Sequence, residues 1–179
     1  LFESTLAQGQ PLKFNEYDWA NLVANELPGV SVKVGLQGGV EPGTTDVLIS
    51  MQASDLFLGA ATFDNQGSRN TGEYRVSAQM QLNSYLGGGE QVSASLSKTE
   101  GSDFLRLAAK FPVALPNWRG LSFELSQSQL NYKVLRSMWG ENAQIAPQGQ
   151  SNTKGFSFAY PWIRSATANL TLSLEREFR

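Results

Sequence analysis

The ionisable side chains of this chain offer few routes to catalysis. The 179-residue sequence contains no histidine and no cysteine, which removes the usual imidazole base, the His-activated nucleophiles, and most zinc and haem sites. Its 16 Asp and Glu residues leave only carboxylate-pair catalysis of the kind that glycosidases use. Because these acids are scattered among predicted turns and single polar strand positions, the sequence disfavours an enzyme and predicts no metal and no cofactor.

Charge and composition exclude two further classes of protein. The chain has 14 Lys and Arg and a net charge of −2 with no long run of either sign, so we expect no nucleic-acid partner. Hydrophobic residues make up 41%, and no stretch approaches the roughly 20 apolar residues of a transmembrane helix. No signal peptide opens the chain, so we expect a mature or internal segment.

Alternating strands dominate the sequence from residue 55 onward. In Tyr74–Leu82 every second residue is apolar, and Arg, Ser and Gln stand between them, which places one set on each face of a strand. In Leu121–Leu135 the phase slips, which predicts a bulge or a strand leaving its buried zone. The predicted strands are Phe57–Phe63, Tyr74–Leu82, Gln91–Lys98, Phe104–Phe111, Leu121–Leu135, Gly155–Trp162 and Ala166–Phe178.

Two architectures fit these strands: a soluble sandwich with one exposed face, or a membrane barrel with lipid outside and water inside. The polar positions are rich in Ser, Gln and Asn, which favours a water-filled lumen. Aromatic residues at strand ends are typical of an interfacial girdle, although they also cap ordinary cores. These aromatic residues are Tyr85, Trp118, Tyr160 and Trp162.

The predicted connections alternate between two kinds. One kind is rich in Gly, Asn and charge, and the other consists of compact turns. Membrane barrels place short turns on the periplasmic side and longer loops outside. The first kind comprises Asp64–Gly72, Thr99–Asp103 and Arg136–Lys154, and the second Asn83–Glu90, Pro112–Gly120 and Ile163–Ser165. A unit that precedes the first strand should therefore lie on the side of the compact turns.

The first 54 residues predict a small α+β unit. Apolar residues at three- and four-residue spacing indicate a helix, for which Asn15 is the expected N-cap. Pro28 and Gly29 end that helix. The predicted elements are helices Leu1–Gln8 and Glu16–Leu27 and strands Val30–Leu36 and Asp46–Gln52. We therefore expect two domains, 1–54 and 55–179.

Five phrases in order along the chain carry a resemblance. They are LVANELPGVSV at Leu22–Val32, PGTTDVLIS at Pro42–Ser50, DNQGSRNTG at Asp64–Gly72, LNSYLGGGEQ at Leu82–Gln91 and YPWIRS at Tyr160–Ser165. Together they resemble the two-partner secretion transporters, the outer-membrane proteins that export haemolysins and filamentous adhesins.

The resemblance implies a mainly β fold with a membrane barrel. About seven antiparallel strands of a larger, roughly 16-stranded barrel would follow part of an α+β POTRA (polypeptide-transport-associated) domain. By this comparison the chain is a fragment. It would lack the first POTRA strand, the preceding POTRA domain, a plug helix and the later barrel strands.

The resemblance also implies a function. The protein would be a transporter in the outer membrane of a Gram-negative bacterium, with its POTRA part in the periplasm. It would recognise an unfolded exoprotein of the adhesin or haemolysin type and secrete it through the pore without nucleotide hydrolysis. Its other partner would be outer-membrane lipid and lipopolysaccharide.

Three groups of site residues follow from the resemblance. A free strand edge with its neighbouring helix would bind the client by β-augmentation: Val30, Val32, Val34, Leu36 and Asn21. Polar strand positions would line the pore: Arg75, Gln79, Arg106 and Lys110. In the first hairpin, Asp64 and Asn65 would form Asx-type turn bonds, and Gly67 and Gly72 would allow positive φ.

Three other interpretations remain open from the sequence. The first is a soluble all-β binding module with an α+β cap. The second is an outer-membrane insertase of the barrel-assembly type. The third is a carboxylate enzyme, for which two acids would have to converge in a cleft.

Overall fold

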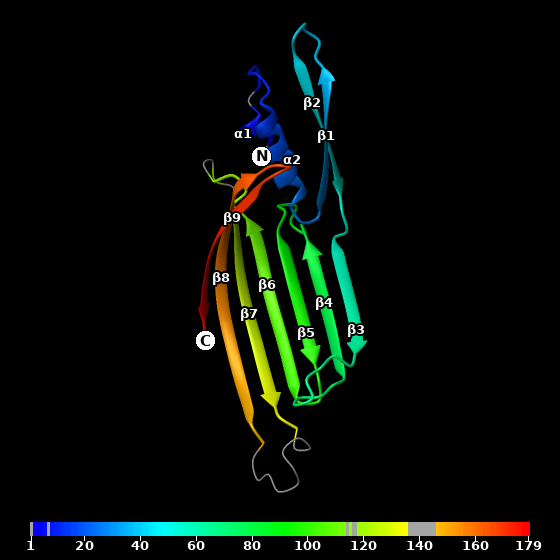
Figure 1. The fold of residues 1–179 in the computed structure, drawn as a ribbon. Helices are drawn as coiled ribbons and strands as arrows, with labels where there is room; N and C mark the ends of the chain where they lie inside the picture. Colours follow the sequence, from blue (N-terminus) through cyan, green and yellow to red (C-terminus); the bar gives the residue numbers. More distant parts are fainter. Residues whose placement is uncertain (1, 7, 114, 116–117, 136–145) are drawn as a thin grey trace.

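The chain forms a tall wall of strands with a small helical unit at one end (Figure 1). The computed structural model describes residues 2–6, 8–113, 115, 118–135 and 146–179. The helical unit contains α1 (Phe2–Thr5), α2 (Phe14–Asn25) and an antiparallel pair of strands, β1 (Val30–Gly38) and β2 (Thr45–Ala53). Neither described helix is long and apolar enough to cross a membrane.

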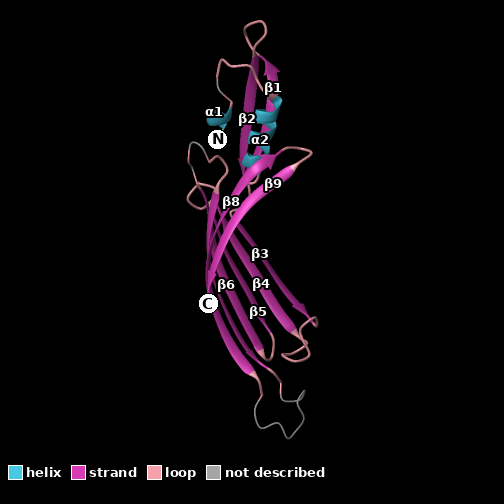
Figure 2. Ribbon diagram, turned by 60° about the vertical axis from the view of Figure 1, so that its left-hand side comes forward, coloured by secondary structure: helices cyan, strands magenta, loops and turns pink. Residues whose placement is uncertain are grey.

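The wall is a seven-stranded antiparallel meander in which every strand pairs with its neighbours in sequence. Figure 2 shows it bent along its length, with the helical unit at one end. We call this end the helix end and the opposite one the loop end. The strands are β3 (Phe57–Asp64), β4 (Arg75–Asn83), β5 (Gln91–Lys98), β6 (Ser102–Pro112), β7 (Ser122–Lys133), β8 (Gln148–Arg164) and β9 (Asn169–Phe178).

The seven strands confirm the predicted ones, with one correction. The predicted loop Arg136–Lys154 is too long, because β8 already begins at Gln148. The β7 register is unbroken on both sides, so of the two predicted causes of the phase slip the bulge is excluded, and β7 instead runs out of the apolar zone. Leu130 lies on the face opposite Leu125, which produces the phase slip in the sequence. The register shift of this sheet lies between Pro161 and Ile163 in β8.

The predicted parity of the connections is confirmed. The compact turns β4–β5, β6–β7 and β8–β9 lie at the helix end, and the other connections lie at the loop end (Figure 1). Residues 136–145 of the longest predicted loop lie outside the described residues.

The predicted helices are each shifted. Helix α1 covers only Phe2–Thr5, and α2 begins at Phe14 after Lys13, which makes no side-chain capping bond. The expected N-cap at Asn15 is therefore wrong. The carbonyl of Lys13 accepts hydrogen bonds from the N–H groups of Glu16 and Tyr17 at 3.0 and 3.1 Å, so the first turn already contains Asn15.

The two parts of the chain bury apolar side chains very differently. The buried hydrophobic residues of the described chain are Ala20, Val23, Ala24 and Val32, all in α2 and β1. Among the described residues of the wall there is no comparable core, and many of its large apolar side chains are exposed. Strand alternation here separates two solvent-accessible faces rather than a core and a surface.

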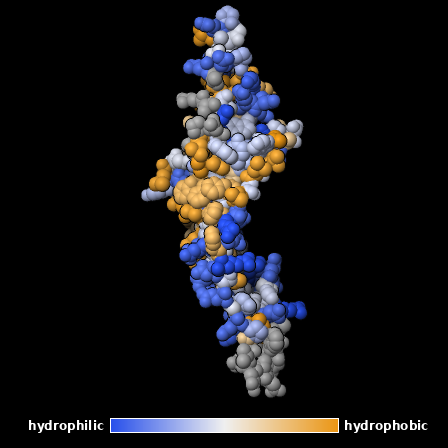
Figure 3. Space-filling view, turned by 90° about the vertical axis from the view of Figure 1, so that its left-hand side faces the viewer, coloured by the Kyte–Doolittle hydropathy of each residue, from blue (hydrophilic) through white to orange (hydrophobic). Residues whose placement is uncertain are grey.

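One face of the wall is apolar and the other polar. Cross-strand register places Leu, Val, Phe and Met side chains together on the apolar face and leaves them exposed. They include Phe57, Val76, Met80, Val92, Leu96, Leu105, Leu107, Leu125, Phe158, Leu172 and Leu174. Figure 3 shows an apolar band across the middle of the molecule, with hydrophilic residues below it.

The apolar face ends before the strands do. Beyond Leu125 in β7 it continues as Gln127, Gln129 and Asn131, paired with polar residues of β8. The β7–β8 hairpin thus extends past the apolar band. This polar extension explains why the first seven residues of β8 carry no apolar alternation in the sequence.

Candidate functional site

The four predicted pore residues share the polar face of the wall. Gln79 and Arg106 lie in one cross-strand row with Ser95 and Ser128. Arg75 pairs with Asp64, and Lys110 lies between Gln91 and Glu124 on the same face. Two of the three cations among these residues are paired with acids on this face. Arg75 meets Asp64, and Arg106 meets Glu124, each with a nitrogen–oxygen distance of 3.1 Å. The face therefore presents hydroxyl and amide groups among largely balanced charges.

Asp64 organises the first hairpin of the wall. One carboxylate oxygen accepts the Gln66 N–H at 2.9 Å, which is the Asx-type turn that the sequence predicts. The other oxygen contacts Arg75. Among the described contacts, the Asn65 side chain makes no such bond. Asp64 thus joins the turn to the polar face.

The two predicted hairpin glycines are needed for different reasons. Gly72 has φ +113°, and a Cβ atom there would lie 2.9 Å from the Glu100 nitrogen. Gly67 does not have positive φ, so that prediction is wrong for Gly67. A side chain at Gly67 would instead overlap the carbonyl oxygens of Gly72 and Glu73. Close backbone approach is the requirement there.

This hairpin holds the loop end together. The Thr71 carbonyl accepts the Gly101 N–H and the Thr99 hydroxyl, both at 2.6 Å. The Asn70 carbonyl accepts the Leu135 N–H at 2.8 Å. Backbone carbonyls of the first loop therefore accept hydrogen bonds from the β5–β6 turn and from the segment that follows β7.

Glu90 organises the β4–β5 turn at the helix end. Its buried carboxylate accepts the N–H groups of Leu86 and Gly88. The Leu86 N–H, followed by further backbone donors, holds the pKa of Glu90 below its usual 4.5. These bonds shape a turn of three glycines, and the last of them, Gly89, approaches Leu27, which follows the end of α2.

Replacement of Glu90 by Gln should change the acid response of the protein. A lowered folded-state pKa means that the carboxylate stabilises the fold above the usual value of 4.5, and that this contribution disappears as the pH falls through the lower folded value. We expect Glu90→Gln to unfold at lower urea at pH 7 and to lose less stability between pH 5 and pH 3. Urea unfolding at both pH values measures this. An equally steep acid loss in both proteins would contradict the role of Glu90.

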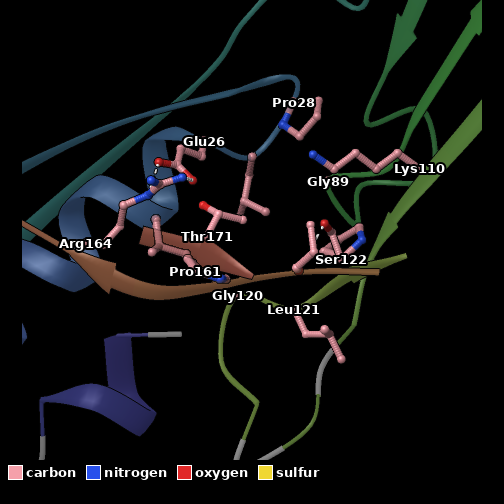
Figure 4. Close-up of a pocket in the computed structure, with 14 residues that line it drawn as sticks. Glu26, Pro28, Gly89, Lys110, Gly120, Leu121, Ser122, Pro161, Arg164 and Thr171 are labelled. Carbon is pink, nitrogen blue, oxygen red and sulfur yellow. Dashed lines mark hydrogen bonds and ion pairs between the residues drawn. The ribbon is translucent and has the colours of Figure 1, made fainter. Parts of the chain in front are cut away.

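Helix α2 rests directly on the turns of the wall (Figure 4). A Cβ atom at Gly120 would lie 2.7 Å from Pro161 and 3.2 Å from Val23. Gly89 likewise allows Leu27 to approach the β4–β5 turn. We call these contacts of α2 and the following Leu27 with Gly89, Gly120 and Pro161 the helix seat.

An ion pair borders the helix seat. Arg164 at the end of β8 meets Glu26 just after α2, with Nε to Oε1 at 2.7 Å and Nη2 donating to Oε2 at 3.0 Å. A pocket of about 140 Å³ lies beside this pair. Its lining includes Lys110 and Ser122 of the polar face (Figure 4). The side of α2 that carries Val23 therefore faces the polar side of the wall.

The aromatic residues noted in the sequence gather at the helix end. Trp118 and Tyr160 meet edge to face with centroids 5.4 Å apart, and Tyr160 contacts Trp162 at 6.2 Å. Trp19 of α2 lies 5.8 Å from the Arg119 guanidinium. Trp118, Tyr160 and Trp162 thus form an aromatic cluster at the rim of the wall on its helix end.

Strand β1 has one edge paired with β2 and one edge facing away. The odd-numbered residues bond to β2, as the ends of the ladder show. The Ser54 N–H donates to the Gly29 carbonyl at 3.0 Å, and the Gly39 N–H donates to the Thr44 carbonyl at 2.9 Å. In an antiparallel pair the alternate residues point their backbone groups outward. Val30, Val32, Val34 and Leu36 therefore form the outer edge.

Helix α2 already occupies part of this edge. The Asn25 side chain accepts the Val32 N–H and donates to the Val32 carbonyl, both at 2.9 Å. The Tyr17 hydroxyl donates to the Val34 carbonyl at 3.1 Å. The expectation of a continuous open edge over Val30–Leu36 is therefore wrong at these groups. Asn21, a predicted client residue, lies behind the edge and contacts Asn25.

The geometry defines a class of protein before any comparison. A curved antiparallel meander with an exposed apolar outer face, a polar inner face and aromatic residues at its rim is the wall of a membrane β-barrel. Residues 43–179 match the family of haemolysin secretion/activation proteins ShlB/FhaC/HecB. The chain belongs to this family, which confirms the resemblance to two-partner secretion transporters.

Individual relatives agree with this family. The chain is 25% identical over 178 residues to the heme/hemopexin transporter protein HuxB of Haemophilus influenzae, covering 99% of this chain and 30% of that protein. It is 28% identical over 126 residues to the outer membrane transporter CdiB of Dickeya dadantii, covering 68% of this chain and 22% of CdiB. The chain thus spans less than a third of these relatives.

Solved structures show the same fold. CdiB from Escherichia coli matches with a TM-score of 0.72 at 15% identity, covering 98% of this chain and 33% of CdiB. BamA from Haemophilus ducreyi, in a form lacking POTRA domains 1–3, matches with a TM-score of 0.55 at 13% identity, covering 98% of this chain and 31% of BamA. At these identities the likeness concerns the fold alone.

Proposed function

We propose that the protein is an outer-membrane transporter that binds an unfolded exoprotein in the periplasm and passes it through its barrel. One observation carries this proposal. The wall has one apolar and one polar face, and at its helix end it bears a helical unit with an outer strand edge on β1. In this proposal residues 1–54 act as a periplasmic POTRA part, and residues 55–179 form barrel wall. The apolar face contacts membrane lipid, and the polar loop end faces lipopolysaccharide.

The polar face lines the path of the client. Arg75, Gln79, Arg106 and Lys110 stand among serines and asparagines, which hydrogen-bond water readily. Because two of the arginines are paired with acids, the wall offers an extended peptide few strong charges to bind. The sequence carries no phosphate-binding glycine loop followed by lysine and serine or threonine, so the proposal needs no nucleotide.

Client recognition uses the open part of the β1 edge. Beyond Val34 the outward N–H and carbonyl of Leu36 have no partner among the described contacts, and the Leu36 side chain is 47% exposed. An extended peptide can add to such an edge through its own backbone groups. The client residues in this proposal are Val30, Val32, Val34 and Leu36, with Asn21 supporting them.

Leu36→Pro should weaken the binding of an extended peptide by about tenfold. Proline removes an edge N–H that points away from β2, so the β1–β2 ladder stays paired. We expect the loss to correspond to roughly one backbone hydrogen bond, or about 1 kcal/mol, together with the lost leucine contact. Fluorescence anisotropy with a labelled peptide of alternating valine and threonine measures it in the full-length protein.

The matched control is Leu36→Thr, which removes the apolar side chain and keeps the N–H. If both variants bind equally weakly, the leucine side chain rather than the edge holds the peptide. Unchanged affinity in both variants would argue against recognition at this edge.

A further inference from the structure

The outer edge of β1 is closed by a side chain that imitates a peptide group. A carboxamide carries one carbonyl and one N–H₂, and Asn25 uses both on the two backbone groups of Val32. A neighbouring β-strand would offer the same donor and acceptor to an outward-facing residue. Asn25 therefore fills the position of a strand that is absent from this edge.

Asn25 is itself held in place. Its Nδ2 lies 3.0 Å from the Asn21 carbonyl and 3.2 Å from Asn21 Oδ1. Tyr17 closes the next outward carbonyl, that of Val34. Tyr17, Asn21 and Asn25 recur at four-residue spacing, so they form one stripe along α2. This stripe runs beside the edge of β1.

The closure covers one end of the edge and leaves the other open. Asn25 at the end of α2 meets Val32, and Tyr17 one turn from its start meets Val34, so helix and strand run antiparallel. Phe14 at the start of α2 and Leu36 in β1 lie past these contacts, with side chains 66% and 47% exposed. An extended chain would meet this apolar end first.

We propose that the Asn25 amide is a displaceable clasp on the client edge of β1. The clasp rests on the proposed function, because it concerns the same edge. An incoming extended segment pairs first with Leu36. It then displaces the Tyr17 hydroxyl from Val34 and finally takes both Val32 groups from Asn25. The occupant is an unfolded polypeptide whose apolar residues alternate with polar ones, because Val34 and Leu36 share one face of β1 and alternate residues of a paired strand would lie beside them.

The experiment compares peptide affinity in variants of the full-length protein in detergent. The probe is a fluorescent peptide of alternating valine and threonine with lysines at both ends. Its control carries N-methyl groups on the pairing edge. Removing two competing hydrogen bonds should tighten binding of the probe to Asn25→Ala by roughly fivefold or more. Asn25→Asp keeps the acceptor for the Val32 N–H and loses the donor. Its affinity for the probe should therefore lie between those of the wild type and Asn25→Ala.

Two further variants separate the clasp from general loosening of the helix. Tyr17→Phe should tighten binding by a smaller factor, since it frees one carbonyl. Asn15→Ala changes an exposed asparagine of the same helix that makes no side-chain hydrogen bond among the described residues, and it should leave affinity unchanged. Hydrogen exchange over residues 14–25 reports whether α2 stays folded. If Asn25→Ala unfolds α2, the affinities of Asn25→Asp and Tyr17→Phe are used to test the clasp instead.

The results distinguish the Asn25 clasp from the proposed binding of peptide at the β1 edge. Equal affinity of the wild type, Asn25→Ala and Asn25→Asp, with Leu36→Pro still weaker, would overturn the clasp and leave the proposed edge standing. Weaker binding to Asn25→Ala with a folded α2 would also overturn the clasp, because Asn25 would then assist binding. Absence of binding to every variant would overturn the edge itself and the clasp with it.

Discussion

Leu107→Arg should destabilise the wall by about 2–4 kcal/mol, whereas Ala108→Arg should cost far less. These neighbours in β6 point to opposite faces. Leu107 is 50% exposed in the middle of the apolar face, beside Ala94. Ala108 lies on the polar face between Ser93 and Ser126. An arginine on the lipid side of a barrel near the bilayer midplane carries this penalty, while the lumen side is wet.

Urea unfolding of the full-length protein in lipid vesicles measures both variants. The difference in mobility between the heated and the unheated protein in detergent gels gives a second reading. Similar costs for the two substitutions would indicate that both faces meet the same solvent, as in a soluble sheet. A larger cost for Ala108→Arg would mean that the polar face is the packed one. Either result would remove the basis for a lipid-facing wall and a water-filled path.

The wall could be predicted from the sequence because alternation survives wherever one face is apolar. Strand β5 coincides with its prediction at both ends, Gln91 and Lys98. The first residues of β8 were not predictable in this way. Gln150 and Asn152 face one side and Ser151 and Thr153 the other, so both faces are polar. Only pairing with β7 reveals that this stretch is a strand.

The contacts of α2 could not be predicted from the sequence. Alternating valines predict β1, but they do not show which strand edge a helix side chain will cover. Asn21 and Asn25 are equivalent by residue type, yet only Asn25 reaches Val32. Glycine and proline in the turns predict a change of direction, and the packing of Gly120 on Pro161 and Val23 depends on distant segments meeting.

Helix α2 faces the wall and the client edge with different sides. Val23 and Asn25 are two residues apart, which places them about 200° apart around a helix. Val23 contributes to the helix seat, and Asn25 closes the β1 edge. A client strand that displaces the clasp would therefore act on a helix that rests on the rim of the barrel. The strength of the helix seat determines whether a movement of α2 caused by this displacement also moves the turns of the wall.

Packing should contribute more to the helix seat than the neighbouring ion pair does. The side chains of Glu26 and Arg164 are 48% and 20% exposed, and partly exposed pairs contribute about 0–1 kcal/mol. At Gly120, by contrast, any side chain must displace Pro161 or Val23. Overpacking of this kind costs about 1–3 kcal/mol. The glycine is therefore the more sensitive position.

Gly120→Ala should accordingly destabilise the protein by about 2–5 kcal/mol, as the sum of this overlap and about 1–2 kcal/mol for a left-handed residue with a Cβ atom. Gly87→Ala is the matched control. Gly87 has φ +79°, close to the +82° of Gly120, and a Cβ atom there meets nothing within 4 Å. We expect Gly120→Ala to unfold at lower urea than Gly87→Ala and, unlike it, to speed hydrogen exchange in α2. Equal stability and equal exchange in the two variants would mean that α2 is not held by the helix seat.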